Sequence, residues 1–276
     1  MFRDAGGPLM PLVESYYFYR YDMPEVTGVE RVDMGQIRFM LRGRGEMRFP
    51  DGHCEPSLPV MVNGPGSAAA SYRVEGPFHC FGISLRAIGW RALIGRPANE
   101  VADTVLDGAE VFGPQVHVLL EQLRALDTLD DMVALVEPLL LAARRPVPKA
   151  HVALARAVRE WAARDEPRIA DLYAAIDMSE RQVIRLCNEY YGGSPKHLER
   201  KFRAIGAAMR IFQGEDPMDV AMRFSDQPHM INEIKRFTGH TPGALRDRID
   251  PVLAITLANE TFHFLPDVIP ESVDVS

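Results

Sequence analysis

Two stretches of the chain repeat one helical pattern at a constant offset of 47 residues. Each starts with a polar capping residue, continues through a short amphipathic helix, stops at a glycine and restarts at a Ser/Thr-Pro pair. The matched positions are Ser179 and Asp226, Val183 and Met230, Cys187 and Ile234, Tyr190 and Phe237, Gly192 and Gly239, and Pro195 and Pro242. Two copies are too few for a solenoid, so the repeat indicates a duplicated supersecondary unit. A capped helix between two turns is typical of half a helix-turn-helix pair, and two such halves favour DNA binding.

The distribution of charge agrees with this interpretation. The whole chain carries 31 Lys/Arg and 38 Asp/Glu, a net charge of −7. Residues 148–248, which hold both copies, have a net charge of +3, whereas the segments before and after them each have −5. A basic segment between acidic neighbours is typical of a nucleic-acid-binding domain joined to a domain with another role.

Before the repeat, the pattern changes from strands to helices. Short alternating runs bounded by glycine and proline predict several strands between residue 10 and about residue 86, with a turn at residues 42–45 and separate strands at 71–74 and 78–83. This spacing predicts a small antiparallel barrel or sandwich. Two apolar stripes, at residues 116–126 and 132–140, predict flanking helices.

The predicted fold class is therefore α+β, with an N-terminal antiparallel barrel or sandwich and a C-terminal all-α region. Arg145-Pro146-Val147-Pro148 cannot continue a helix and predicts a linker. We expect domains at 1–147 and 148–250, followed by an acidic tail at 251–276. In the second domain we expect seven helices, the third starting at a Ser179–Gln182 capping box and the fourth at Ser194-Pro195.

Other classes of protein find little support. No apolar run reaches the ~18 residues of a membrane span, and the first residues have no apolar signal core, so we expect a cytoplasmic protein without a membrane partner. The chain lacks P-loop, GxSxG and HExxH motifs, so we expect neither an enzyme nor a cofactor. His53, Cys54, His79 and Cys80 lack the HxH pair of a cupin metal site, so we expect no metal.

The motifs in the repeat carry a family resemblance. Residues 179–186 (SERQVIRL) and 193–200 (GSPKHLER) resemble the first half of an AraC/XylS-type DNA-binding domain. Residues 224–229 (FSDQPH) and 236–242 (RFTGHTP) resemble the second half. The resemblance covers about residues 150–248, and the part before the linker is similar, more loosely, to the cupin-like sensor domains found in this family.

The resemblance implies seven helices, of which the third and sixth enter successive major grooves of double-stranded DNA. It also implies regulation of transcription, with RNA polymerase or another regulator as a partner. The residues that match base-facing positions are Arg181, Ile184 and Arg185, with Gln182 beside them, and Gln227, Pro228, His229, Ile231 and Asn232. Phosphate contacts are expected from Lys196, Arg200, Lys235 and Arg236.

Some positions depart from the family pattern. Asp177 and Arg223 occupy the turn positions where the family has glycine, and Asn232 stands where it typically has arginine. The second unit could thus be distorted, be weakly specific, or serve mainly for contact with the DNA backbone. Ile184 and Ile231 could contact a thymine methyl, form a protein interface or be buried.

The role of the N-terminal part is open at this stage. Tyr17, Arg38, Phe39 and His79 are candidates for a ligand pocket that binds a small-molecule or protein effector, although half of any strand faces the core in any case. The leucine-rich helices near 116–141 could form a homodimer or cover the sheet. Two alternatives to a DNA-binding regulator remain: a partner-binding module with a degenerate DNA-binding domain, and a cupin-type enzyme.

Overall fold

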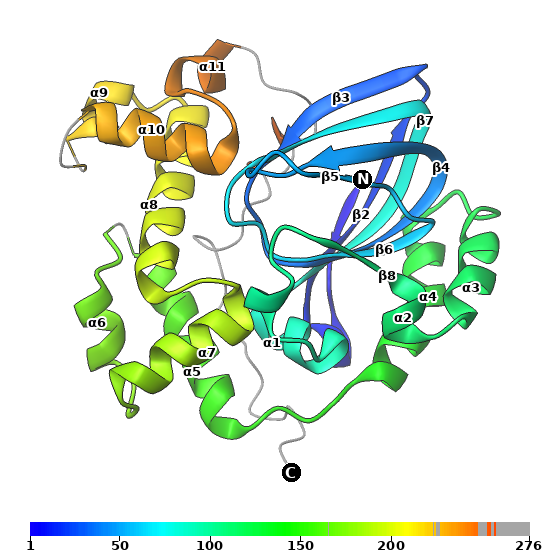
Figure 1. Cartoon of the computed structure of the whole chain (residues 1–276), viewed down its shortest axis with the longest axis horizontal. Helices are drawn as coiled ribbons and strands as arrows, with labels where there is room; N and C mark the ends of the chain where they lie inside the picture. Colours follow the sequence, from blue (N-terminus) through cyan, green and yellow to red (C-terminus); the bar gives the residue numbers. More distant parts are fainter. Residues whose placement is uncertain (165, 223, 225–226, 248–252, 255–256, 258–276) are drawn as a thin grey trace.

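The chain combines an antiparallel sheet with helices on both of its sides (Figure 1). The structure is a computed structural model that describes all residues except 165, 223, 225–226, 248–252, 255–256 and 258–276. Its α+β class is the one predicted. The acidic tail expected at 251–276 lies almost entirely outside the described residues, as do Arg223 and Asp226.

The described residues form one eight-stranded sheet in the order β1-β2-β7-β4-β6-β8, in which β3 also pairs with β7 and β5 with β4. Every pairing is antiparallel. The strands are β1 (Phe2–Asp4), β2 (Val13–Tyr21), β3 (Glu25–Glu30), β4 (Gln36–Arg48), β5 (Cys54–Pro56), β6 (Val60–Asn63), β7 (Ala70–Leu85) and β8 (Val105–Asp107).

The two longest strands correct the predicted turns. Residues 42–45 lie inside β4, and the predicted strands 71–74 and 78–83 are one strand, β7. Gly43 and Gly76 have φ values of +84° and +78° and face each other across the β4–β7 pair, where the register shifts. A Cβ on Gly43 would lie 2.7 Å from the carbonyl oxygen of Pro77. The glycines therefore form a bulge in two continuous strands rather than two turns.

The two faces of the sheet have different environments because side chains alternate along a strand. Ile37 and Phe39 of β4 belong to the main hydrophobic core. Met40 belongs to a smaller cluster with Met61 and Cys80, and it lines a cavity together with Arg38. One face thus packs on helices, and the other encloses a cavity.

Helices α2–α4 and the C-terminal helices lie on opposite sides of the sheet (Figure 1). Trp90, in the short helical segment after β7, is fully buried in the main core and donates through Nε1 to the carbonyl of Arg96, 2.8 Å away. The short segments are η1 (Gly7–Leu9), α1 (Ala87–Gly89), the π-helical turn η2 (Trp90–Ile94) and η3 (Ala98–Glu100). The longer helices are α2 (Gly108–Phe112), α3 (Gln115–Leu123) and α4 (Leu129–Ala143).

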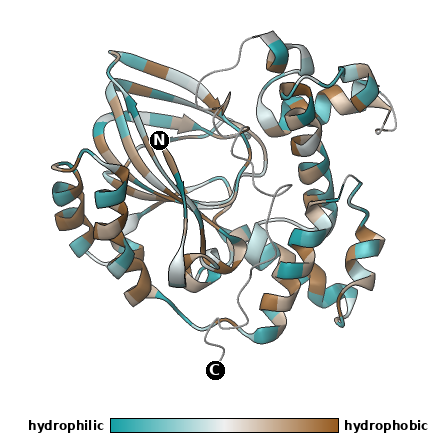
Figure 2. Ribbon diagram, turned by 180° about the vertical axis from the view of Figure 1, so that it is seen from behind, coloured by the Kyte–Doolittle hydropathy of each residue, from teal (hydrophilic) through white to brown (hydrophobic). Residues whose placement is uncertain are grey.

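The C-terminal region contains two helix-turn-helix units joined by a long helix. The first unit is α6 and α7, the second is α9 and α10, and α8 connects them. The helices are α5 (Lys149–Ala162), α6 (Ile169–Ala174), α7 (Glu180–Tyr191), α8 (Pro195–Phe212), α9 (Pro217–Ala221), α10 (Gln227–Thr238) and α11 (Pro242–Asp247). The helices carry polar and apolar residues side by side, as expected for helices that bury one face (Figure 2).

The buried apolar residues connect the sheet to both units. The main core continues from the sheet through α5 and α7 to Phe202 of α8. A second core contains Met230, Ile234 and Phe237 of α10, and it includes Val32, which follows β3. Both units are therefore packed against the N-terminal part, and the division at residue 147 stays a prediction from the sequence.

Candidate functional site

Helix α7 is positioned by local capping and by its apolar face. The Ser179 hydroxyl accepts from the Gln182 backbone N–H, and the Gln182 side chain accepts from the Ser179 backbone N–H, which confirms the predicted capping box. Gly192 ends the helix with φ +76°. Asp177 does not need the left-handed conformation of a turn glycine, because Asp103 is the non-glycine residue with positive φ among those described.

The exposed face of α7 holds the four residues predicted to meet DNA: Arg181, Gln182, Ile184 and Arg185. Arg185 is ion-paired with Glu189 at 2.6 Å while its side chain remains 55% exposed. The Ile184 side chain is among the exposed large hydrophobic residues of the described chain, so it is not a core residue. The carbonyl oxygen of the Gln182 side chain is occupied by the cap, so only its amide group is left for a base.

Helix α10 presents a similar face. The exposed residues are Gln227, Pro228, His229, Asn232, Lys235 and Arg236. Ile231 is half-buried and packs against the second core, so the two matched isoleucines differ in environment. The Gln227 amide contacts the sulfur of Met218 at 3.5 Å, and Arg236 lies over the Phe237 ring at 5.7 Å.

The side chains predicted to contact phosphates differ in whether they are exposed or already paired with another residue. Lys196 is exposed near the start of α8. Arg200 instead forms a bidentate ion pair with Glu233 of α10, at 2.8 and 2.7 Å. The Glu233 side chain is only 8% exposed, and its bonds to Arg200 lower the pKa of this carboxyl group. Arg200 therefore joins α8 to α10, a contact between helices that its place in the sequence motif did not indicate.

The carboxyl end of α10 is held by the N-terminal sheet. The backbone N–H of Val32 donates to the carbonyl of Phe237 at 2.8 Å, and that of Ala69 donates to the carbonyl of Arg236 at 2.9 Å. These anchor residues, Val32 and Ala69, flank the last residue pair of β3 and β7, in which Glu30 faces Ala70. They provide hydrogen bonds for helix carbonyls that have no partner within the helix.

Two further contacts make the same interface close. The ammonium group of Lys201 donates to the carbonyl of Asp33 at 3.2 Å. Gly239 has φ +78°, and a Cβ at this position would lie 2.2 Å from a methyl carbon of Val29. The first unit has a comparable contact, since a Cβ on Gly192 would lie 3.2 Å from the Pro65 ring. The N-terminal part thus contacts the carboxyl ends of both exposed helices, through β3 at Gly239 and through the loop after β6 at Gly192.

A cavity of about 580 Å³, counting the space at its open mouth, lies on the face of the sheet that does not pack on α2–α4. Its lining is mainly apolar and includes three methionines and three aromatic rings. The polar residues at its wall are Glu30, Arg38, Glu46, Glu55, Ser57 and Asn63, with the hydroxyls of Tyr19 and Tyr72.

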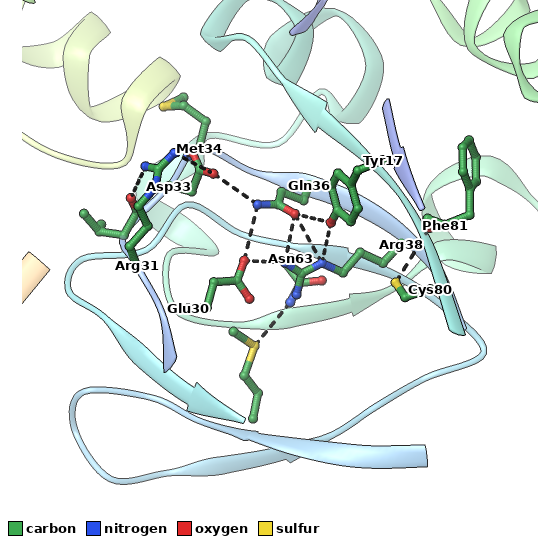
Figure 3. Close-up of polar contacts among 12 residues, drawn as sticks. Tyr17, Glu30, Arg31, Asp33, Met34, Gln36, Arg38, Asn63, Cys80 and Phe81 are labelled. Carbon is green, nitrogen blue, oxygen red and sulfur yellow. Dashed lines mark hydrogen bonds and ion pairs between the residues drawn. The ribbon is translucent and has the colours of Figure 1, made fainter. Parts of the chain in front are cut away.

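A buried polar network forms one wall of this cavity (Figure 3). Arg38 Nε donates to the Tyr17 hydroxyl at 2.9 Å, and its Nη2 donates to Gln36 Oε1 at 2.8 Å and pairs with Glu30. The Tyr17 hydroxyl donates to Gln36, whose amide donates to Glu30 at 3.3 Å. Burial lowers the pKa of Arg38 and Glu30 raises it, with a net increase, so the guanidinium stays charged.

The candidate ligand residues divide between the two faces of the sheet. Arg38 lines the cavity, whereas Tyr17 does not. The Tyr17 ring packs against Gly82, where a Cβ would overlap it. Phe39 belongs to the main core, and His79 bonds to Asp22 at 2.7 Å rather than lining the cavity. Sequence reasoning missed Glu30 and Asn63, although the alternation around Arg38 indicated which face to search.

Within the described part of the chain, no group of three or more His, Cys, Asp or Glu side chains is arranged to hold a metal ion. No helix among the same residues is long and apolar enough to cross a membrane.

Comparisons with known proteins match most of the sheet and, more distantly, most of the chain. The profile of a domain of unknown function (DUF6597) matches residues 5–107, which form most of the sheet. No curated protein matches the chain. A crystal structure of ToxT from Vibrio cholerae O395 is 10% identical with a TM-score of 0.46, and the match covers 88% of this chain and 96% of that one.

Two other ToxT structures give similar values. A 1.65 Å structure from Vibrio cholerae is 9% identical with a TM-score of 0.47, covering 88% of this chain and 98% of that one. A structure of unsaturated fatty acid bound wild-type ToxT from Vibrio cholerae strain SCE256 is 10% identical with a TM-score of 0.44, covering 85% and 94%.

Proposed function

We propose that this chain is a sequence-specific DNA-binding transcription regulator of the AraC/XylS type, whose N-terminal sheet senses an effector. The observation that carries the proposal is the shared design of α7 and α10. Both helices belong to a duplicated unit, both bury one apolar face, and both leave a polar face open to solvent. An exposed polar helix face is what a major groove admits.

The connection between the helices supports the proposal. Helix α8 has 18 residues, which gives a length of about 27 Å. The first unit lies at one end of α8 and the second at the other (Figure 1). Successive major grooves on one side of B-DNA are about 34 Å apart. A rigid connector of this length is suited to placing two helices in neighbouring grooves.

The proposed base contacts follow from side-chain chemistry. Arg181 and Arg185 can each bind guanine through two hydrogen bonds, and Asn232 and Gln227 can bind adenine in the same way. The exposed methyl groups of Ile184 suit a thymine methyl. Lys196 and Lys235 are free to contact phosphates, together with Arg236.

The anchor residues, Val32 and Ala69, provide a route for regulation. They lie next to the paired ends of β3 and β7 and bind α10, and the last residue of β3, Glu30, lines the cavity. A ligand that moves Glu30 would change the hydrogen bonds at the end of α10. The position of the second unit relative to DNA would change with them.

The proposal is tested by DNA binding of two matched variants. Arg185→Ala removes one candidate base contact, and Arg156→Ala removes an exposed arginine from α5, outside both units. We expect Arg185→Ala to weaken binding to a preferred site by about 1–3 kcal/mol and to relax the choice at one base position. Arg156→Ala should leave both properties unchanged.

A protein-binding role is the second candidate, because Ile184, Met218 and Met222 are exposed apolar side chains on the two units. The outcome that favours this role has two parts. Neither arginine variant distinguishes one duplex sequence from another, and the affinity for DNA does not fall as the salt concentration rises.

A further inference from the structure

The cavity in the sheet differs from an anion site in its charges. Its wall carries three carboxylates, Glu30, Glu46 and Glu55, and one cation, Arg38. Arg38 is already paired with Glu30. An anionic ligand at Arg38 would have to displace Glu30 and approach the carboxylates of Glu46 and Glu55. A positively charged ligand would meet an excess of negative charge.

One buried acceptor atom in the cavity wall, Asn63 Oδ1, also lacks a hydrogen-bond donor. Asn63 is 5% exposed, and its amide group contacts the sulfur of Met47 at 3.4 Å. Its Oδ1 is buried and has no hydrogen-bond partner, which makes it one of few such side-chain atoms in the described part of the chain. A buried acceptor without a donor is costly, so an N–H group from a ligand would relieve it.

The apolar side of the cavity suits the rest of such a molecule. The ring of Phe78 lies 6.3 Å from that of Tyr19 and 6.1 Å from that of Tyr72, so the three rings form one cluster at the wall. Aromatic faces attract cations, and methionine side chains adapt to apolar groups of different shapes.

We propose that the cavity binds an organic cation, a protonated amine with an apolar body, and that this cation is the effector. Its ammonium group would lie near Glu30 and Asn63, and its apolar part would pack on the ring cluster. This inference rests on the proposed function in one respect, because the cation would compete with Arg38 for Glu30 and so act on the anchor residues that hold α10. The binding site itself is independent of DNA.

The test uses three probes of similar shape and different charge: 4-phenylbutylamine, 4-phenylbutanol and 4-phenylbutanoate. Their binding to the full chain at pH 7 is measured by titration calorimetry without DNA. We expect the amine to bind at least about tenfold more tightly than the alcohol and the carboxylate. Equal or tighter binding of the carboxylate would overturn the proposal in favour of an anion site at Arg38, and no binding of any probe would also overturn it.

Variants locate the site. Glu30→Gln removes the proposed partner of the ammonium group, and Glu25→Gln is the matched control, since Glu25 is on the same strand but pairs with Arg73 outside the cavity. We expect Glu30→Gln to abolish the preference for the amine and Glu25→Gln to keep it. Tyr72→Leu keeps every charge and should weaken the amine about fivefold or more, which preserves the test if Glu30→Gln does not fold. Retention of full amine affinity in both cavity variants would refute the site.

DNA binding by the same samples separates this inference from the proposed function. If the chain binds DNA but does not prefer the amine, the proposed function stands and the cation site is refuted. If the chain binds the amine but not DNA, the cation site stands and the proposed function is refuted.

Discussion

Replacing Arg200 with alanine separates two roles for this residue, a phosphate contact and a tie between helices. The structure favours the second role, because Arg200 binds both carboxylate oxygens of Glu233 at 2.8 and 2.7 Å. In Arg200→Ala the Glu233 carboxylate, 8% exposed, would lose this partner. Breaking a fully buried pair costs about 3–5 kcal/mol, but the Arg200 side chain is 37% exposed, so solvent screens part of the interaction. We expect a loss of about 2 kcal/mol in the free energy of unfolding.

The pH dependence gives a second measure of the same pair. The bonds from Arg200 lower the pKa of Glu233 below its ordinary value of 4.5. A lowered carboxyl pKa contributes stability above the unfolded-state pKa, and this stability is lost as the pH falls through the folded-state pKa. The difference between wild type and Arg200→Ala should therefore be complete at pH 7 and should shrink below pH 4.5.

The assay is urea unfolding of wild type, Arg200→Ala, Glu233→Ala and the double variant, with Lys196→Ala as an exposed control. The double variant should recover much of the loss, because no unpaired carboxylate remains. In DNA titrations, Lys196→Ala should reduce the salt dependence by about one phosphate without loss of stability. If Arg200→Ala is as stable as wild type and shows the reduced salt dependence instead, Arg200 is a phosphate contact and not a tie between the two helices.

Two further predictions concern single side chains. In thermal unfolding, Gly239→Ala should destabilise the chain by about 1–3 kcal/mol, because the new Cβ would overlap Val29 at a backbone φ that favours glycine. The control is Gly243→Ala, which should be neutral or slightly stabilising because the space around Gly243 is open. Equal effects of the two variants would contradict a close contact between Gly239 and Val29. Burial, together with the positive charge of Lys201, lowers the pKa of His197 from 6.5 to about 4. Since the unfolded chain then takes up the proton first, wild type should lose on the order of 2 kcal/mol more stability than His197→Asn between pH 7 and pH 4.5, and parallel pH profiles would contradict this.

The parts of the fold that were predictable depend on local chemistry. The starts of α7 and α8 follow from Ser179 with Gln182 and from Ser194 with Pro195, because a helix cap acts over three or four residues. The apolar faces of α7 and α10 follow in the same way from helical spacing.

The parts that were missed depend on contacts between distant residues. Gly43 and Gly76 indicate turns when each is taken alone, and only their pairing across β4 and β7 turns them into a bulge. The position of Val32 in the second core and the bond between Arg200 and Glu233 also join segments far apart in the sequence. No local pattern contains this information.

The cavity shows the same division. Arg38 was a candidate because it lies on a predicted strand, and half of any strand faces the inside of a barrel. Glu30 and Asn63 join it only through the register of β3, β4 and β6, which the sequence does not specify. Phe39 was a candidate on the same predicted strand, yet the alternation of side chains places it on the opposite face of the sheet from Arg38.

The central claim is that α7 and α10 both contact bases, and selection of duplex DNA from a random pool by the full chain tests it most directly. The selection is run near physiological salt, with and without 4-phenylbutylamine. We expect an enriched site with two half-motifs separated by about one helical turn. A single enriched half-motif would restrict base recognition to one unit, and no enrichment under either condition would contradict the claim.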